Sequence, residues 1–344
     1  MQIDEVDAKI LKTLLKESRT SFTNMAKMCG ITIGAVRMRY KNLWKAGIIN
    51  GEVMLVNPHS LGYKHIVDLG ITTLLQNEKE AMEFLKNKPY IRHIVGPFGK
   101  YNFWAKVALR DVKKLTEILQ DLESNSFIEH VDSFIWAEAV NIEYPDNLVI
   151  NSIRGSSHDC ADKLRQSCSL EEINIDTIDR KIATILSQHS RTPFRKIGAE
   201  VGVSTKNVIQ RYKKLRENVL ALSTITVDLE KLGYKSAASI FMKVTNRSKM
   251  LEICTQLFQI PNLIAMIRLI GVYDLYVNIV LADFEDLFRA TEQIRRVQGI
   301  EKTETILTPA IRAWPLHLFP SLLQSDLMEP KCWFDNWIDD SKKL

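Results

Sequence analysis

The sequence IDEVDAKI at residues 3–10 returns at residues 175–182 as IDTIDRKI, and this repetition decides how the chain is organised. The match continues with Ser18-Arg19-Thr20 against Ser190-Arg191-Thr192. Between residues 3–43 and 175–215, about 16 of 41 aligned positions are identical. A period near 172 residues is too long for a solenoid repeat. The sequence therefore predicts a tandem fusion of one two-part unit.

The basic charge of the chain is concentrated in the first fifty residues of each copy. The whole chain of 344 residues has a net charge of +5. Residues 1–50 hold 9 basic and 4 acidic side chains, residues 173–222 hold 10 and 4, and all other residues hold 27 and 33. The same sign asymmetry in both copies favours a polyanion as partner of these segments over a merely solvated face.

The composition is typical of a folded protein with several domains, at 46% hydrophobic and 25% charged residues. No uninterrupted apolar run is long enough to span a membrane, and the acidic start lacks the layout of a signal peptide. We therefore expect a cytoplasmic protein with no membrane partner. Five scattered cysteines argue against a disulfide framework and a paired zinc site. Because no nucleophile–base pair, phosphate loop or metal cluster is recognisable, we expect no enzyme, no metal and no cofactor.

Each basic segment is predicted to be a helix-turn-helix domain, at residues 1–50 and 173–222. In the first copy, apolar spacing predicts a helix over about 4–17 and a second helix capped by Thr20 or Ser21. A turn at Gly30 then leads to a third helix capped by Thr32. The second copy has corresponding signals at Thr192, Pro193, Gly202 and Ser204.

The outward face of each third helix is predicted to contact DNA, the alternative being a three-helix bundle that binds protein. Residues near the helix start would approach base edges, where Arg prefers guanine and Gln prefers adenine. Basic residues further along, with Arg39 and Arg211, would hold phosphates. The predicted DNA-binding residues are Thr32, Gly34, Arg37, Met38, Arg39, Lys41 and Lys45 in the first copy and Ser204, Lys206, Gln210, Arg211, Lys213 and Lys214 in the second.

The segments 51–144 and 223–310 are predicted to be α+β regulatory modules. After a leading strand, each shows the order β-α-β-β-α-β of the ferredoxin-like split unit. The bare face of such a sheet must be covered, and the second copy can cover it as an intrachain pseudo-dimer. Residues 145–172 are expected to be a linker, flexible near Gly155. Residues 311–344 are expected to be a Trp-rich tail without counterpart in the first copy, packed on the chain's own sandwich or used in an oligomer contact.

The order and spacing of these motifs, seen twice, resemble the Lrp/AsnC (feast/famine) family of prokaryotic transcriptional regulators over about residues 1–143 and 173–310. The resemblance implies two winged helix-turn-helix domains and an effector site at the family's Gly-x-Tyr-Asp loop, although a turn glycine there is also explained by backbone geometry alone. The chain departs from the family in carrying two copies, in Asn102 at the usual Asp position, and in residues 217–220, which replace a Gly-Ile-Ile ending. The effector-binding residues implied are Gly99, Tyr101, Asn102, Gly271, Tyr273 and Asp274.

Together these features predict a sequence-specific, double-stranded-DNA-binding transcriptional regulator. It would assemble as a homo-oligomer, a dimer of tandem chains, and respond to a small effector such as an amino acid. One alternative is a siroheme decarboxylase, because residues 101–104 are similar to a Tyr-Asn-Leu-Trp run of those enzymes. The Arg and His that precede that run in the decarboxylases are not found here. The other alternative is an assembly adaptor that has lost DNA binding.

Overall fold

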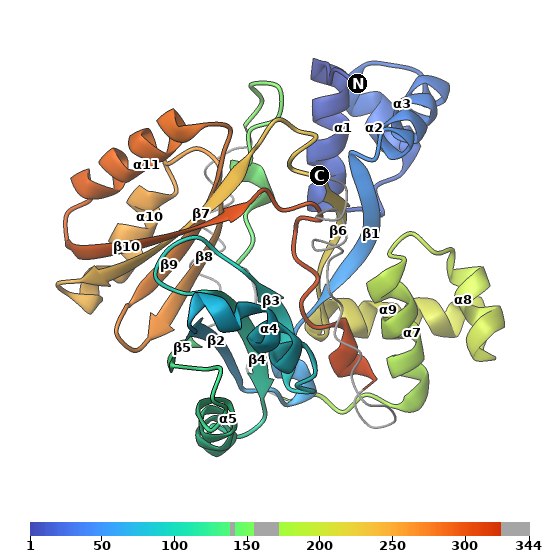
Figure 1. Ribbon diagram of the computed structural model, residues 1–344. Helices are drawn as coiled ribbons and strands as arrows, with labels where there is room; N and C mark the ends of the chain where they lie inside the picture. The colour runs from blue at the N-terminus through green and yellow to red at the C-terminus, as the bar shows by residue number, and fades with distance from the viewer. Residues whose placement is uncertain (138–141, 155–171, 325–344) are drawn as a thin grey trace.

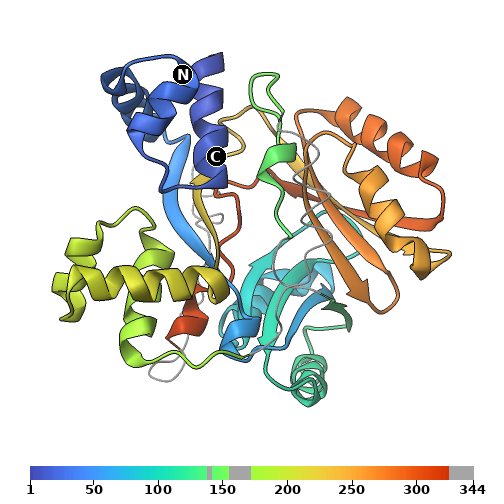
Figure 2. The ribbon, with the colours of Figure 1, turned by 180° about the vertical axis from the view of Figure 1, so that it is seen from behind.

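The computed structural model describes residues 1–137, 142–154 and 172–324. Two helix-turn-helix units lie on one side of the molecule and two strand-and-helix modules on the other, as Figures 1 and 2 show from opposite directions. In the described ranges, no helix is long and apolar enough to cross a membrane. The first unit consists of α1 (Glu5–Lys16), α2 (Phe22–Cys29) and α3 (Ile33–Lys45), and the second of α7 (Thr177–Gln188), α8 (Phe194–Val201) and α9 (Thr205–Asn218).

Local sequence accounts for where these helices begin and end. Asp4 accepts a hydrogen bond from the Asp7 N–H, and Asp7 accepts one from the Asp4 N–H, so that two backbone donors are satisfied reciprocally. The second copy repeats this capping box at the start of α7. The expected cap at Thr192 is wrong, because the extended Pro193 occupies the position before α8 and no side chain caps that helix. The chain leaves α2 and α8 through glycines with left-handed backbone conformation, as predicted.

Each module is a four-stranded antiparallel sheet with two helices on its outer face. The strand orders β5-β2-β4-β3 and β10-β7-β9-β8 are those of the predicted ferredoxin-like unit. The first module contains β2 (His65–Thr72), α4 (Glu78–Lys86), β3 (Ile91–Val95), β4 (Phe103–Leu109), α5 (Lys113–Glu123) and β5 (His130–Trp136). The second contains β7 (Ser236–Val244), α10 (Met250–Leu257), β8 (Leu263–Ile270), β9 (Leu275–Leu281), α11 (Phe284–Arg296) and β10 (Ile300–Pro309).

The two sheets join at two places that occupy equivalent positions of the repeat. Ile135 of β5 pairs with Ile270 of β8, and Phe98, beyond the end of β3, pairs with Leu307 of β10. The inner faces of the sheets then enclose one aromatic core, so the second copy covers the bare face of the first, as expected. Its members include Tyr101, Trp104, Phe134, Phe241, Tyr273 and Tyr276.

The strands that follow the third helices pair with each other across the two copies. β1 (Ile49–Val56) and β6 (Leu220–Val227) form an antiparallel ribbon between the two helix-turn-helix units. The first helix of each unit packs against the ribbon strand of the other copy, α1 on β6 and α7 on β1. Leu11 and Leu15 of α1 therefore share a core with Ile225 and Val227 of β6. Each unit is completed by the other copy, which makes the tandem an intrachain pseudo-dimer.

Both copies continue from their last strand into a segment that returns to the first helix of the same copy. After β5, the 3-10 turn η3 (Pro145–Asn147) packs on α1, and after β10, the turn η5 (Pro320–Leu323) packs on α7. An aromatic residue precedes the proline in both, Tyr144 and Phe319. The turn at Pro320–Leu323 of the tail therefore has a counterpart in the first copy, which sequence reasoning did not find, and residues 145–153, expected as linker, are packed structure.

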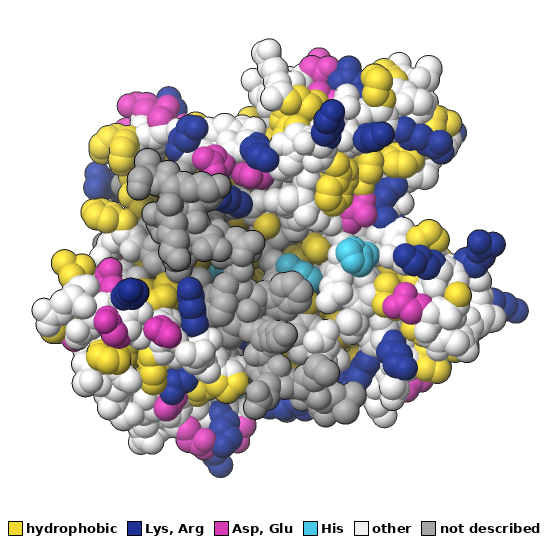
Figure 3. All heavy atoms as spheres, turned by 45° about the vertical axis from the view of Figure 1, so that its right-hand side comes forward, with side chains coloured by type: hydrophobic (Ala, Val, Ile, Leu, Met, Phe, Trp, Pro, Cys, Tyr) yellow, Lys and Arg dark blue, Asp and Glu magenta, His cyan; other side chains and the backbone are white. Residues whose placement is uncertain are grey.

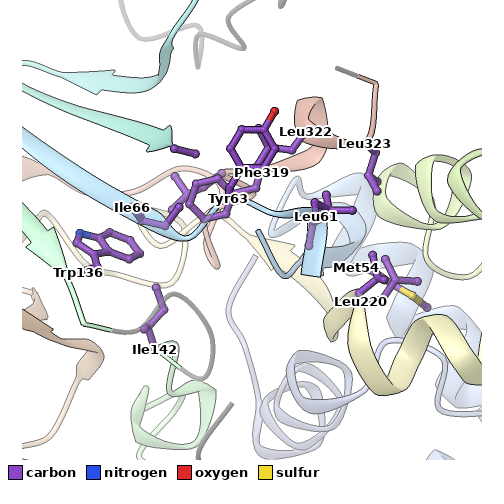
Figure 4. Packing of buried hydrophobic residues seen from close by; sticks show 14 of the residues in the cluster. Met54, Leu61, Tyr63, Ile66, Trp136, Ile142, Leu220, Phe319, Leu322 and Leu323 are labelled. Carbon is purple, nitrogen blue, oxygen red and sulfur yellow. The ribbon is translucent and has the colours of Figure 1, made fainter. Parts of the chain in front are cut away.

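Figure 4 shows Phe319, Leu322 and Leu323 of the tail near Leu61 and Tyr63 of the first copy, and all five belong to one buried cluster. The described part of the tail thus packs within the chain, one of the two roles expected for it. The predicted flexible site at Gly155 and the tryptophans at 333 and 337 lie outside the described residues.

Candidate nucleic-acid interface

Helix α3 presents one solvent-exposed face and buries the opposite one. Val36 and Leu43 are fully buried against α1 and α2. The Thr32 hydroxyl accepts a hydrogen bond from the Ala35 N–H at 3.2 Å, so it starts the helix and remains exposed beside it. The exposed face consists of Ile33, Gly34, Arg37, Met38, Lys41, Asn42 and Lys45, which includes every predicted contact of this helix except Arg39.

Helix α9 is built in the same way with a different exposed face. Ser204 caps the helix by accepting a hydrogen bond from the Asn207 N–H at 3.2 Å, and Val208 and Leu215 are buried. Lys214 donates to the Asn174 carbonyl at 3.2 Å. The helix continues to Asn218 and passes almost directly into β6, so it ends differently from α3, as the sequence suggested. The exposed face consists of Thr205, Lys206, Ile209, Gln210, Lys213, Lys214 and Glu217.

Arg39 and Arg211 do not belong to these faces. Arg39 Nη1 lies 2.6 Å from Asp4 Oδ2 and 2.8 Å from Asp7 Oδ1, which joins α3 to the capping box of α1. Arg211 makes the equivalent pairs, at 2.6 and 2.7 Å, with the capping box of α7. These contacts give both arginines a structural role within their own unit, and a phosphate contact by either of them stays a prediction.

The two helix-turn-helix units meet at the Ser-Arg-Thr turns that marked the repeat. The hydroxyl oxygens of Ser18 and Ser190 lie 2.6 Å apart, at the point where the two copies face each other. Arg19 donates to the Ser190 carbonyl and, at 3.1 Å, to the Thr192 carbonyl. Arg191 makes the equivalent bonds to the carbonyls of residues 18 and 20. The turn of each unit is thus fastened to the turn of the other.

Each of these arginines also lies over aromatic rings of the opposite unit. The Arg19 guanidinium carbon is 4.3 Å from the ring centre of Phe194 on α8 and 5.5 Å from that of Tyr212 on α9. Arg191 lies 4.9 and 5.7 Å from the equivalent rings on α2 and α3. Cation–π attraction of this kind fixes the orientation of α3 relative to α9. Sequence reasoning used these residues only to align the copies; their identity in both copies was the available signal.

Lysine and arginine side chains gather on both helix-turn-helix lobes in the space-filling view of Figure 3, with few acidic side chains among them. The charge partition of the sequence therefore corresponds to a surface of the folded chain. Exposed cations on a helix that projects from its domain are suited to phosphate and base contacts in a major groove.

In the first copy, the residue at the expected effector position has partners within its own module. Asn102 Oδ1 accepts a hydrogen bond from the Thr73 N–H at 2.9 Å, and Asn102 Nδ2 donates to Glu78 Oε1 at 2.6 Å. The side chain therefore connects the end of β2 with the start of α4.

In the second copy, Asp274 makes the equivalent backbone contact with a different set of neighbours. Its Oδ2 accepts from the Val244 N–H at 3.0 Å, and its carboxylate lies 2.6 Å from Arg247 and 3.2 Å from Lys243. Burial opposes ionisation of Asp274, but the backbone hydrogen bond and the two cations outweigh it and hold its pKa below the ordinary value.

The other expected effector residues take part in the junction of the two sheets. Tyr101 is 3% exposed and donates to Asp132 at 2.8 Å, while Tyr273 stacks on Phe134. Gly99 and Gly271 have φ of +142° and +149°, and a Cβ at Gly99 would lie 3.1 Å from an Ile306 methyl. Effector binding at these loops stays a prediction, and the contacts give Tyr101, Asn102 and Asp274 internal partners.

A cavity of about 20 Å³ lies between the inner faces of both modules and the segments that follow β5 and β10. Its lining includes Lys106, Glu143, Asn278 and Trp314, and the buried Asn278 Oδ1 has no hydrogen-bond partner among the described residues. This volume fits one water molecule and is far too small for a tetrapyrrole.

Comparison with known proteins identifies both helix-turn-helix units. An AsnC-type helix-turn-helix domain model matches residues 175–216, and a winged helix-turn-helix DNA-binding model matches residues 3–50. The HTH-type transcriptional regulator LrpA of Pyrococcus horikoshii is 37% identical over 119 residues, which cover 35% of this chain and 84% of LrpA. The chain belongs to the Lrp/AsnC family. It is accordingly a DNA-binding transcriptional regulator of the Lrp/AsnC type.

Another Lrp/AsnC relative is the regulatory protein AsnC of Haemophilus influenzae, 29% identical over 120 residues, 34% of this chain and 79% of AsnC. Over its whole length, the fold is similar to that of the siroheme decarboxylase NirDL, with a TM-score of 0.60, 13% identity, and coverage of 93% of this chain and 98% of the other. At this identity the likeness concerns the fold alone.

Proposed function

We propose that both helix-turn-helix units of one chain bind the same DNA duplex, with the exposed faces of α3 and α9 in its major groove. The observation that carries this proposal is the reciprocal insertion of Arg19 and Arg191, which holds the two helices as one pair. A family member with a single copy needs a second chain for such a pair; here the second copy supplies it.

The contacts divide by chemistry. Arg37 and Gln210 lie near the helix starts, are exposed, and carry the donors and acceptors that base edges recognise. Lys41 and Lys213 lie one turn further along and are suited to phosphates. Lys45 and Lys206 add exposed positive charge at opposite ends of the two helices.

Binding of duplex DNA at several salt concentrations tests this assignment. Replacement of Arg37, Lys41, Lys206 and Lys213 by Ala should lower the affinity at least about 10-fold and reduce the dependence of log K on log salt, because fewer counterions are released. The matched control replaces four exposed module lysines, Lys64, Lys79, Lys113 and Lys302, by Ala and removes the same charge. Equal affinities of the two variants would contradict the assignment.

We propose that the protein has no enzymatic activity. The relatives named above, LrpA and AsnC, are transcriptional regulators. Incubation with siroheme followed by gel filtration should leave the protein without a Soret absorbance. A retained Soret band would favour the decarboxylase alternative.

We further propose that two tandem chains associate. Phe284 and Phe288, one turn apart on α11, are 74% and 68% exposed, which is unusual for large apolar side chains on a free surface. Light scattering should give twice the mass of one chain, and Phe288→Glu should reduce it to one. Binding of an amino-acid effector at the Gly-x-Tyr loops stays a prediction, favoured in the second copy, where Asp274 keeps the family residue. A shift in melting temperature caused by an amino acid and lost in Asp274→Asn would support it, and no shift with any amino acid would contradict it.

A further inference from the structure

We propose that the two recognition helices read different base pairs, so that the DNA site of this chain is asymmetric: G·C on the side of α3 and an A·T step on the side of α9. This inference rests on the proposed DNA binding and concerns what the same two faces recognise.

The two helices present their side chains from equivalent scaffolds. Both begin immediately after a hydroxyl cap that accepts a hydrogen bond at 3.2 Å from the N–H three residues on. Both are joined to the preceding capping box by an arginine, Arg39 or Arg211, with distances that agree within 0.1 Å. Residues 172 positions apart therefore occupy the same place on the two helices. Where their side chains differ, the two helices present different chemical groups to the major groove.

On this scaffold, two exposed positions at the beginning of the second helical turn differ in chemistry. Arg37 of α3 corresponds to Ile209 of α9, and Met38 corresponds to Gln210. All four side chains are exposed, with Met38 at 60% and Ile209 at 38%. The apolar side chains of Met38 and Ile209 lie in solvent, so they do not contribute to the core of either unit and are available to contact bases.

Each side chain has a preferred base. Arginine donates two hydrogen bonds to O6 and N7 of guanine, glutamine pairs with N6 and N7 of adenine, and an apolar side chain contacts the thymine methyl. The α3 face therefore favours G·C through Arg37, whose guanidinium now lies 5.8 Å from the Phe22 ring and remains exposed. The α9 face favours adenine through Gln210 with a thymine methyl against Ile209.

The distal ends of the helices extend the difference. Lys45 at the end of α3 corresponds to Glu217 at the end of α9, both exposed. A carboxylate near the phosphate backbone is repelled, so the second unit approaches DNA with less positive charge at that end. Because Arg19 and Arg191 fix the order of the units, the chain binds its site in one direction.

Selection of binding sequences from randomised duplexes, with the full chain, tests the proposal. Within the site bound by one chain, the expected motif has a G·C block in one half and an A·T step in the other; a dimer of chains would repeat this asymmetric unit in inverted order. Two halves that read the same base pairs within one chain's site, or binding without sequence preference, overturn the inference and leave the proposed DNA binding intact. Absence of any DNA binding overturns both.

A grafted variant makes the test sharper. Arg37→Ile with Met38→Gln gives α3 the reading residues of α9, and both positions are exposed, so the melting temperature should not change. The G·C block should be replaced by an A·T step, and the original site should bind about 5- to 150-fold more weakly. Lys41→Ala is the control and should weaken all sequences alike. An unchanged motif in the grafted variant overturns the inference.

Discussion

The segments that follow the two modules anchor the two helix-turn-helix units by opposite chemistry. In the first copy, Lys12 of α1 is 9% exposed and donates to the carbonyls of Pro145 and Asp146 at 3.0 Å. In the second copy, Leu322 and Leu323 pack against the apolar side of α7. The backbone course is the same in both copies. A turn that returns to the first helix can thus be held either by a buried ammonium that satisfies carbonyl oxygens or by apolar burial.

The inner faces of the two sheets show the same kind of difference. In the first module, Asp68 and Lys106 sit opposite each other on β2 and β4 as a buried ion pair with an N–O distance of 2.6 Å. In the second module, Ser239 and Asn278 occupy the corresponding cross-strand position, with neutral side chains 3.5 Å apart. Both solutions keep a polar pair inside the sandwich, but only the first depends on keeping both partners.

The largest loss of stability is expected when the ion pair of the first module is broken. Asp68→Ser leaves the Lys106 ammonium buried without its carboxylate and removes the acceptor of Trp136 Nε1. We expect a loss of about 3–5 kcal/mol in the free energy of unfolding. The double variant Asp68→Ser with Lys106→Asn, which copies the second module, should lose clearly less. Urea unfolding measures both, and a double variant less stable than the single one would contradict the comparison.

A smaller loss of stability is expected when the pH is lowered, because a buried histidine lies in the segment after β10. Burial lowers the pKa of His317 to about 4, and its Nε2 has no hydrogen-bond partner in the described chain. Since the folded-state pKa lies below the ordinary 6.5, the unfolded chain binds more protons between these values. Stability is therefore complete above pH 6.5 and is lost as pH falls toward 4, by at most about 1.4 kcal/mol per pH unit.

His317→Leu isolates this contribution, because the corresponding segment of the first copy, residues 142–154, contains no histidine. The variant should lose less free energy of unfolding than the original chain between pH 7 and pH 5. Urea unfolding of both proteins at the two pH values measures the difference. If the variant and the original chain lose the same free energy of unfolding, His317 does not contribute to acid sensitivity.

The smallest effect concerns the loop between β3 and β4. Asn102→Asp brings a carboxylate against Glu78, where the second copy has Arg247 and Lys243 around Asp274. We expect a loss of about 1 kcal/mol, because one hydrogen bond is replaced by repulsion. Asn102→Asp with Glu78→Lys should recover most of it. The melting temperatures of the original chain, the single variant and the double variant measure this effect. An unchanged melting temperature of the single variant would contradict the role given to Asn102.

Much of the fold was predictable because its signals are local. Helical spacing and capping residues act within one or two turns, which is why the predicted third helices and their buried faces agree with α3 and α9. The exposure of Arg37, Lys41 and Gln210 follows from the same periodicity. The order of strands and helices in each module followed from the alternation of apolar patterns.

Sequence reasoning did not find the contacts of side chains whose partners are distant in sequence. Arg39 is basic and lies on a third helix, but the carboxylates that engage it are 35 and 32 residues away. The role of Arg19 depends on rings more than 170 residues further along the chain. The counterpart of the tail was missed because Tyr144-Pro145 and Phe319-Pro320 share little else in sequence.

The sequence by itself determined that the chain is a duplicated unit, where its helices begin, and which faces carry positive charge. Only the tertiary structure decided that β1 pairs with β6, that the sheets join at Ile135–Ile270 and Phe98–Leu307, and that each turn arginine enters the opposite unit. Strand edges offer the same backbone donors and acceptors to any partner, so their choice depends on which surfaces the whole chain can bury together. The pairing of strands across the two copies joins two similar halves of the sequence into one folded unit.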